Sequence, residues 1–130
     1  MNEKFPSAEK LKSKILIDRL FSEGRSIKKF PLKLFFIPIE NSEITTHKTG
    51  VSVPKRIFKK AVDRNYLKRL MREVFRKNKY LVDNNLEKKF ALMFIYTGPK
   101  KVDYQSLSTC MIWILNKLIE REGTHENKIN

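Results

Sequence analysis

The sequence is poor in cysteine, in glycine and in acidic side chains, and each shortage excludes a class of protein. The single cysteine, Cys110, cannot form an intramolecular disulfide, which fits a reducing compartment. Four glycines leave no glycine-rich loop for a nucleotide phosphate. No apolar run approaches the roughly 18–20 residues that span a bilayer. The first ten residues contain no apolar signal-peptide core, so we expect a cytoplasmic protein.

Catalytic and metal-binding groupings are also missing from the sequence. His47 falls in a predicted loop and His125 near the end, and two distant histidines with one cysteine make no zinc site. The acidic residues are scattered, so the sequence offers no carboxylate pair for nuclease chemistry. Cys110 lies beside an apolar helix stripe without a basic neighbour, and we interpret it as a buried apolar residue. We therefore predict no protein catalytic residue and no metal bound by the protein alone.

Positive charge is the dominant feature of what is present. The chain has 28 Lys and Arg against 14 Asp and Glu, a formal net charge of +14 and a pI near 10.0. Such a charge opposes compaction, so it indicates binding to a polyanion, either nucleic acid or an anionic membrane. The 41% of hydrophobic residues and the length of 130 residues are typical of one folded domain with a real core.

The order of hydrophobic patterns predicts an α+β domain over residues 1–122, with helices packed on a small mixed sheet as a two-layer sandwich. Residues 123–130 form a polar tail that we expect to be disordered. In chain order we predict a helix over 13–24 with Ser13 as N-cap and Gly24 as its stop, a strand over 30–40, a hairpin loop over 41–47, a strand over 48–56, a helix over about 60–79, a polar connector over 81–89, a buried strand over 90–99 and a helix starting near Asp103.

Alternation along the first long strand predicts two different faces. One face has Leu32, Leu34 and Phe36, and the other has Lys33, Phe35 and Ile37. The last helix has an apolar stripe at helical spacing, and we place Trp113 between this helix and the sheet. The residues of the stripe are Leu107, Met111, Ile114, Leu115 and Leu118. The aromatic residues that we assign to the core are Phe30, Phe36, Phe90 and Phe94.

The stretch AVDRNYLKRLMREVFRKNKY, residues 61–80, combines a cationic half and an apolar half on one helix. At about 100° per residue, the polar positions that fall within about 140° of each other are Arg64, Asn65, Lys68, Arg69, Arg72 and Arg76. From Lys55 to Lys79 there are eleven basic residues and only two acidic ones, Asp63 and Glu73. Solvated faces usually mix both signs, and like charges four residues apart repel each other. Phosphate groups would relieve that repulsion, and the planar fork of arginine binds them well.

The sequence resembles the protein component of bacterial ribonuclease P in AVDRNYLKRLMRE, in GVSVPKR before it and in LIDRLFSEGRS further upstream. The similarity spans about residues 11–118. The family has an Arg-Asn-Arg triplet, a Lys-Arg pair and a further Arg on one helix. The matching residues are Arg64, Asn65, Lys68, Arg69 and Arg72. Two positions depart from the pattern: Tyr66 replaces the last Arg of the triplet, and Asp63 precedes it where a basic or neutral residue is usual. We expect Tyr66 to pack on the apolar side of the helix, with its hydroxyl at the edge.

The resemblance implies a fold and a function. The fold is an α+β sandwich with a left-handed βαβ crossover and a cleft between the sheet and the first helix. By this resemblance the protein would be the accessory subunit of a hydrolase, the tRNA 5′-maturation endoribonuclease, whose RNA subunit cleaves precursor tRNA with Mg²⁺. The residues that would bind the catalytic RNA are Arg64, Asn65, Lys68, Arg69, Arg72 and Arg76. The residues that would hold the 5′ leader of precursor tRNA in the cleft are Phe21, Lys33, Phe35, Lys55 and Arg56. The family often has a second aromatic residue where this chain has Ile17.

A basic helix also occurs in three other classes of protein, of which only the first fits the rest of this sequence. A general RNA-binding or ribosome-associated protein of similar fold remains an alternative. A helix-based DNA-binding domain would need a short helix before the basic one, and here a strand precedes it. A membrane-surface role would need the apolar half of the helix, which the core requires. We therefore expect the catalytic RNA and precursor tRNA as partners, and neither DNA nor a membrane.

Overall fold

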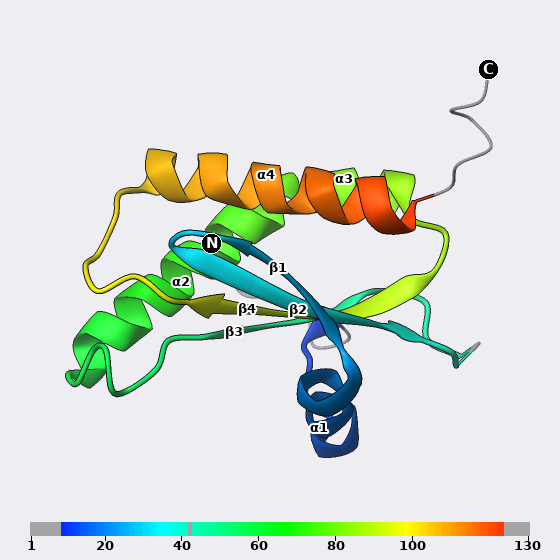
Figure 1. Cartoon of the computed structure of the whole chain (residues 1–130), viewed down its shortest axis with the longest axis horizontal. Helices are drawn as coiled ribbons and strands as arrows, with labels where there is room; N and C mark the ends of the chain where they lie inside the picture. The colour runs from blue at the N-terminus through cyan, green and yellow to red at the C-terminus, as the bar shows by residue number, and fades with distance from the viewer. Residues whose placement is uncertain (1–8, 42, 124–130) are drawn as a thin grey trace.

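A four-stranded mixed sheet forms the centre of the protein, with helices on both of its faces (Figure 1). The structure is a computed structural model, and it describes residues 9–41 and 43–123. The elements in chain order are α1 (Lys14–Glu23), β1 (Arg25–Lys29), β2 (Leu32–Ile39), β3 (Lys48–Ser52), α2 (Ala61–Asn78), α3 (Tyr80–Asn85), β4 (Lys89–Tyr96) and α4 (Tyr104–Glu122). This arrangement confirms the predicted α+β class and the mixed sheet. Most of the polar tail predicted at 123–130 lies outside the described residues.

The strands lie in the order β1-β2-β4-β3. Strands β1 and β2 are antiparallel, β2 and β4 are antiparallel, and β3 and β4 are parallel. The hairpin predicted over residues 41–47 is therefore wrong, because β4 lies between β2 and β3. The parallel pair is joined through α2 and α3, so the expected βαβ unit is present, and its left-handed sense stays a prediction.

The main core fills the space between the sheet and α2, α3 and α4, which cover one face together (Figure 1). A row of register partners crosses all four strands on this face: Ile27, Leu34, Phe94 and Val51. Leu32, Leu34 and Phe36 are fully buried, which confirms the predicted alternation of β2. The predicted stripe of α4 is also fully buried. Burial of this apolar surface stabilises the fold and fixes α2 against the sheet.

Helix α1 packs on the opposite face and covers only part of it (Figure 1). Its buried Leu20 contacts a small cluster that includes Ile37 and Met93. The Ser13 hydroxyl accepts a hydrogen bond from the Leu16 N–H at 3.2 Å, and the Gly24 N–H donates to the Leu20 carbonyl at 2.9 Å. A Cβ at Gly24 would lie 2.3 Å from that carbonyl oxygen, so no larger residue fits there. Both predicted ends of the helix are confirmed.

Two elements and two aromatic positions differ from the sequence predictions. Strand β1 was not predicted, and the predicted connector after the basic helix begins with the short helix α3. Phe30 is 67% exposed in the turn between β1 and β2. Trp113 is 41% exposed because it lies on the side of α4 away from the apolar stripe, beside the ammonium groups of Lys29 and Lys117. Both aromatic residues were wrongly assigned to packed positions.

Candidate nucleic-acid interface

The polar side of α2 carries a row of cations that have no acidic partner among the residues that the structure describes. The apolar side of the helix buries Leu67, Met71 and Val74 against the sheet. On the other side, the side chains of Lys68, Arg69 and Arg72 form no ion pair or hydrogen bond within residues 9–41 and 43–123. Asn65 is exposed beside them. The predicted division of the helix is confirmed, and the side chains of this row are available to phosphate groups.

Arg64 and Arg76, at the two ends of the predicted RNA-binding set, already have protein partners. The guanidinium of Arg64 donates to the carbonyls of Phe58 and Lys59, each at 2.9 Å. It therefore fixes the loop between β3 and α2. The guanidinium of Arg76 donates to both carboxylate oxygens of Glu73 at 3.1 Å. These contacts occupy N–H donors of both arginines, and at Arg76 the Glu73 carboxylate also offsets the positive charge.

The two departures from the family pattern, Asp63 and Tyr66, share one partner. The ammonium of Lys101 lies 2.8 Å from Asp63 Oδ1 and 5.3 Å from the centroid of the Tyr66 ring. The hydrogen bond from Lys101 lowers the pKa of Asp63, which keeps that carboxyl ionised. Tyr66 is 48% exposed, so the expectation that it packs on the apolar side is wrong. It lies at the edge of the helix, where the side chain reaches Lys101 instead of the core.

A second group combines aromatic rings and cations on the sheet face that α1 leaves partly open. The rings of Phe21 on α1 and Phe35 on β2 meet edge to face with centroids 5.1 Å apart. The ammonium of Lys33 lies 4.8 Å from the Phe35 centroid. Phe21 is 46% exposed and Phe35 is half-buried. The structure thus brings together three of the five residues predicted for the leader-binding cleft.

The other two predicted cleft residues lie where this face continues beyond β3. Ile95 is the register partner of both Lys33 and Ser52, so these residues share one row across the sheet. Lys55 and Arg56 are exposed in the turn just after β3, in the loop that Arg64 holds. Lys55 and Arg56 thus follow the end of β3 in the chain, and no described contact joins them to Phe21, Lys33 or Phe35.

Sequence reasoning missed two cations of these surfaces. Lys28 is the register partner of Lys33 and lies on the same face of the sheet. Its position could be inferred only after the pairing of β1 with β2 was known. The sequence did not reveal β1, because this strand has a single buried residue, Ile27. Lys101 precedes α4 in a loop, and no sequence spacing connects it to Asp63.

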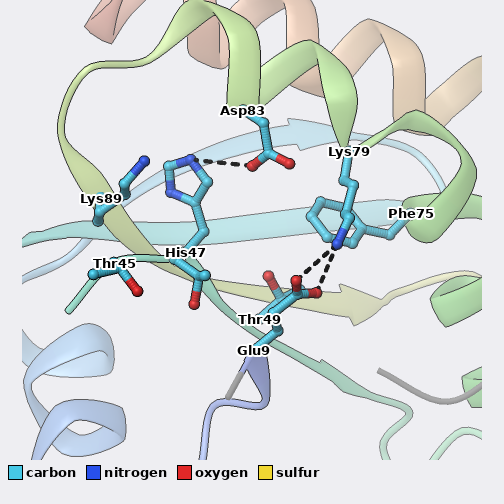
Figure 2. Close-up of a pocket in the computed structure, with 9 residues that line it drawn as sticks. Glu9, Thr45, His47, Thr49, Phe75, Lys79, Asp83 and Lys89 are labelled. Atoms are coloured by element: carbon cyan, nitrogen blue, oxygen red, sulfur yellow. Dashed lines mark hydrogen bonds and ion pairs between the residues drawn. The ribbon is translucent and has the colours of Figure 1, made fainter. Parts of the chain in front are cut away.

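A small polar pocket lies at the other end of the sheet, near the junction of α2 and α3 (Figure 2). It has a volume of about 180 Å³, and the ammonium of Lys79 lies 2.8 Å from both carboxylate oxygens of Glu9 in its wall. His47 is buried there, and its Nδ1 accepts a hydrogen bond from the Phe90 N–H at 3.0 Å. Its Nε2 lies 3.8 Å from Asp83 Oδ1. Burial lowers the pKa of His47 even though Asp83 opposes the shift, so the imidazole is neutral at pH 7.

Other chemistry that the sequence raised can now be placed. Cys110 is buried, its thiol donates to the Lys29 carbonyl at 3.0 Å, and burial raises its pKa to about 11. Such a thiol is a poor nucleophile at neutral pH. Within the described part of the chain, no three His, Cys, Asp or Glu side chains are grouped to hold a metal ion. None of the described helices is long and apolar enough to cross a membrane.

The mixed sheet, the cationic helix and the aromatic–cationic face are typical of a small nucleic-acid-binding protein of the α+β class. The family model of ribonuclease P matches residues 5–119. The ribonuclease P protein component of Thermotoga maritima is 32% identical over 128 residues, covering 95% of this chain and 100% of the relative. That of Borrelia turicatae is 30% identical over 114 residues, covering 86% of this chain and 93% of the relative. The chain belongs to the ribonuclease P protein family.

Solved structures agree with this assignment at the level of the fold. The RNase P protein of Staphylococcus aureus superposes with a TM-score of 0.69 at 22% identity, covering 85% of this chain and 94% of that one. The RNase P protein of Thermotoga maritima also gives a TM-score of 0.69, at 24% identity, with 84% and 96% covered.

Proposed function

We propose that the chain is the protein subunit of a ribonuclease P, a cytoplasmic ribonucleoprotein endonuclease that matures the 5′ end of tRNA. The observation that carries the proposal is the row of Lys68, Arg69 and Arg72, which lies on the motif helix and has no acidic partner among the described residues. Under this proposal the RNA subunit performs the hydrolysis with Mg²⁺, and the protein contributes binding surfaces. No protein side chain takes part in the chemical step.

The cationic side of α2 binds the RNA subunit mainly through phosphate groups. Arginine and lysine side chains that neutralise phosphates release counterions, so the affinity falls as salt rises. Arg69 and Arg72 carry most of this contact because neither has an ion-pair partner within residues 9–41 and 43–123, while Arg76 is already paired with Glu73. Arg64 contributes by holding the loop with Lys55 and Arg56 against α2.

The partly open sheet face binds the single-stranded 5′ leader of precursor tRNA. Single-stranded RNA is held by stacking of its bases on aromatic rings and by cations along its backbone. Phe21, Phe35 and Lys33 provide both within one contact group. Lys55 and Arg56 extend the charge in the direction of the RNA subunit.

Reconstitution tests the proposal directly. The purified protein, the ribonuclease P RNA transcribed from the same genome, and the two together are each incubated with precursor tRNA and Mg²⁺. We expect cleavage at the mature 5′ end when the RNA is present, with the protein lowering the Mg²⁺ or salt needed. Cleavage at this position by the protein alone would contradict the proposal.

The phosphate-binding role of α2 is tested by salt titration. About six phosphate contacts give a slope of roughly −4 to −5 in a plot of log affinity against log salt concentration. Arg69→Ala and Arg72→Ala should each weaken binding to the RNA subunit and reduce the slope by about one. Arg121→Ala, at an exposed position in the last turn of α4, is the matched control and should change neither. Circular dichroism should show an unchanged fold in all three variants.

A general RNA-binding protein of similar fold is the second candidate, favoured by the same cationic surfaces. The two candidates differ in their response to the leader. The reconstituted complex should bind leader-bearing precursor tRNA more tightly than leaderless tRNA. Equal affinity for both substrates would favour the general RNA-binding function.

A further inference from the structure

A groove lies between α2 and the start of α4, directly beside the cationic row. Its volume of about 470 Å³ falls within the roughly 300–1,000 Å³ of typical small-molecule sites. The residues that line it are Tyr66, Arg69, Leu70, Glu73, Lys77 and Tyr104. Arg69 belongs to the proposed RNA-binding row, so a ligand in the groove would be continuous with RNA bound along α2.

Two tyrosine rings form part of the walls, and each has a lysine ammonium against it. Lys101 lies 5.3 Å from the Tyr66 centroid, and Lys77 lies 5.6 Å from the Tyr104 centroid. Tyr66 is 48% exposed and Tyr104 is half-buried. Exposed rings that are restrained by cation–π contacts are suited to stacking on another flat ring.

The charge in the groove favours an anion next to that flat ring. Glu73 is the acidic residue of the lining, and it pairs with Arg76 at 3.1 Å and with Lys77 at 3.4 Å. Arg69 has no ion-pair partner in the described part of the chain. A guanidinium without a partner, beside aromatic rings, matches a phosphate attached to a base.

Tyr66 lines the wall of this groove, and Asp63 supports that wall through Lys101. Asp63 holds the Lys101 ammonium at 2.8 Å, and this ammonium lies against Tyr66. An arginine in place of Tyr66 would be repelled by Lys101, and without Asp63 the lysine would lose its anchor. Asp63 and Lys101 therefore restrain the Tyr66 ring in the wall of the groove.

We propose that the groove binds one unpaired nucleotide of the ribonuclease P RNA, with the base against Tyr66 and Tyr104 and the phosphate on Arg69. The inference rests on the proposed function and extends it, because it adds recognition of an exposed base to the binding of phosphates. Stacked bases are found in single-stranded loops and bulges, so the nucleotide belongs to an unpaired segment of the RNA.

Binding measurements with three variants test the proposal against the transcribed RNA subunit. Tyr66→Leu should weaken binding about tenfold, the effect of losing one stacked base. Its salt slope should stay as in the wild type, because no charge is lost, whereas Arg69→Gln should reduce the slope by about one. Tyr66→Phe keeps the ring and should bind within about twofold of the wild type. Tyr80→Leu is the matched control, since Tyr80 is 57% exposed on α3 and does not line the groove.

Fluorotyrosine spectroscopy of the full chain gives a second, direct readout. The four tyrosine signals are assigned by single Tyr→Phe variants, and the RNA subunit is then added. We expect the signals of Tyr66 and Tyr104 to shift and that of Tyr80 to stay. A Tyr66→Leu variant that binds like the wild type, or unshifted Tyr66 and Tyr104 signals, would overturn the nucleotide proposal. If Tyr66→Leu bound like the wild type but Arg69→Gln still weakened binding, only the nucleotide proposal would fail and the proposed function would stand. If the RNA subunit did not bind the wild-type protein at all, both the proposed function and the nucleotide proposal would fail.

A protein occupant of the groove is excluded by one further measurement. Sedimentation of the free protein should show a monomer for both the wild type and Tyr66→Leu. A dimer that Tyr66→Leu abolished, together with unchanged RNA affinity, would assign the groove to contact between two copies of the chain and would overturn the proposal.

Discussion

The two faces of the central sheet use neighbouring residues of the same strand for different purposes. On the helix-covered face, Phe36 is fully buried and meets the Phe90 ring edge to face at 6.2 Å. On the opposite face, Phe35 is half-buried, touches Phe21 and lies under the Lys33 ammonium. Side chains alternate along a strand, so one residue step separates a ring that stabilises the fold from a ring that a ligand can reach. Because α1 covers only part of the opposite face, the Phe35 ring stays partly accessible while the main core remains closed.

The largest effect should come from the covered face. Phe36→Ala leaves a cavity in the main core and should lower the free energy of unfolding by about 3–5 kcal/mol. Urea denaturation followed by circular dichroism measures this loss. A decrease below about 1.5 kcal/mol would show that this face is not the packed core of the protein.

A smaller loss of stability and a selective loss of binding should come from the open face. Phe35→Ala should lower the unfolding free energy by about 1–2 kcal/mol, because the ring is only half-buried. In the reconstituted complex it should weaken binding of leader-bearing precursor tRNA about tenfold and leave leaderless tRNA unchanged. Phe30→Ala, which removes an exposed ring in the β1–β2 turn, is the control. Equal losses on both substrates would contradict the assignment of Phe35 to the leader.

The elements that sequence reasoning found are those specified by local patterns. The N-cap Ser13 and the terminal Gly24 defined α1, because a cap acts on the backbone within one turn. The alternation of β2 and the stripe of α4 predicted which side chains are buried, since each pattern has a single period over at least two turns or five strand residues.

The elements that it missed depend on partners far away in the sequence. Strand β1 has one buried residue among exposed ones, and it exists as a strand because β2 pairs with it. Helix α3 buries only Val82, beneath α4. The insertion of β4 between β2 and β3 is a long-range pairing that no turn signal specifies. Trp113 could have been placed correctly, because it lies about 240° from Leu107 on the helix and so away from the stripe.

The candidate sites follow the same division between local and distant information. The cationic side of α2 could be predicted because all of its residues belong to one helix. Only the family resemblance placed Phe21 and Phe35 in one cleft, because two separate elements supply the rings, and their ring contact is seen only in the folded protein. The link from Lys101 to Asp63 and Tyr66 could not be predicted, because the loop before α4 reaches α2 only in the folded protein.

The buried His47 in the small polar pocket should make the free energy of unfolding depend on pH. Burial lowers the pKa of His47 below its ordinary 6.5, with a smaller lowering by Lys89, while Asp83 and Glu9 oppose the shift (Figure 2). Well above pH 6.5, at about pH 7.5 and higher, the imidazole is neutral in both the folded and the unfolded state, so it contributes no pH dependence there. Below that pH the unfolded chain takes up the proton first, and stability falls by at most about 1.4 kcal/mol per pH unit until the folded-state pKa is reached. His47→Asn keeps an acceptor for the Phe90 N–H and should remove this slope, as urea denaturation between about pH 5 and pH 8 would show. An identical pH dependence in both proteins would assign the titration to another group.

The smallest effect should come from the exposed ion pairs of α1. The Lys14 ammonium lies 3.5 Å from Asp18 Oδ2, with the two side chains 87% and 68% exposed. An ion pair in this setting contributes less than about 0.5 kcal/mol, because water and salt screen it. Asp18→Asn should therefore leave urea unfolding nearly unchanged at both low and high salt, since α1 is fixed to the sheet through the buried Leu20. A loss above about 1 kcal/mol that disappeared at high salt would show that surface charge holds α1 in place. In that case packing would hold the helices on the covered face, whereas charge pairs would hold α1 on the open face. Leader binding would then depend on salt in two ways, through the position of α1 and through phosphate contacts.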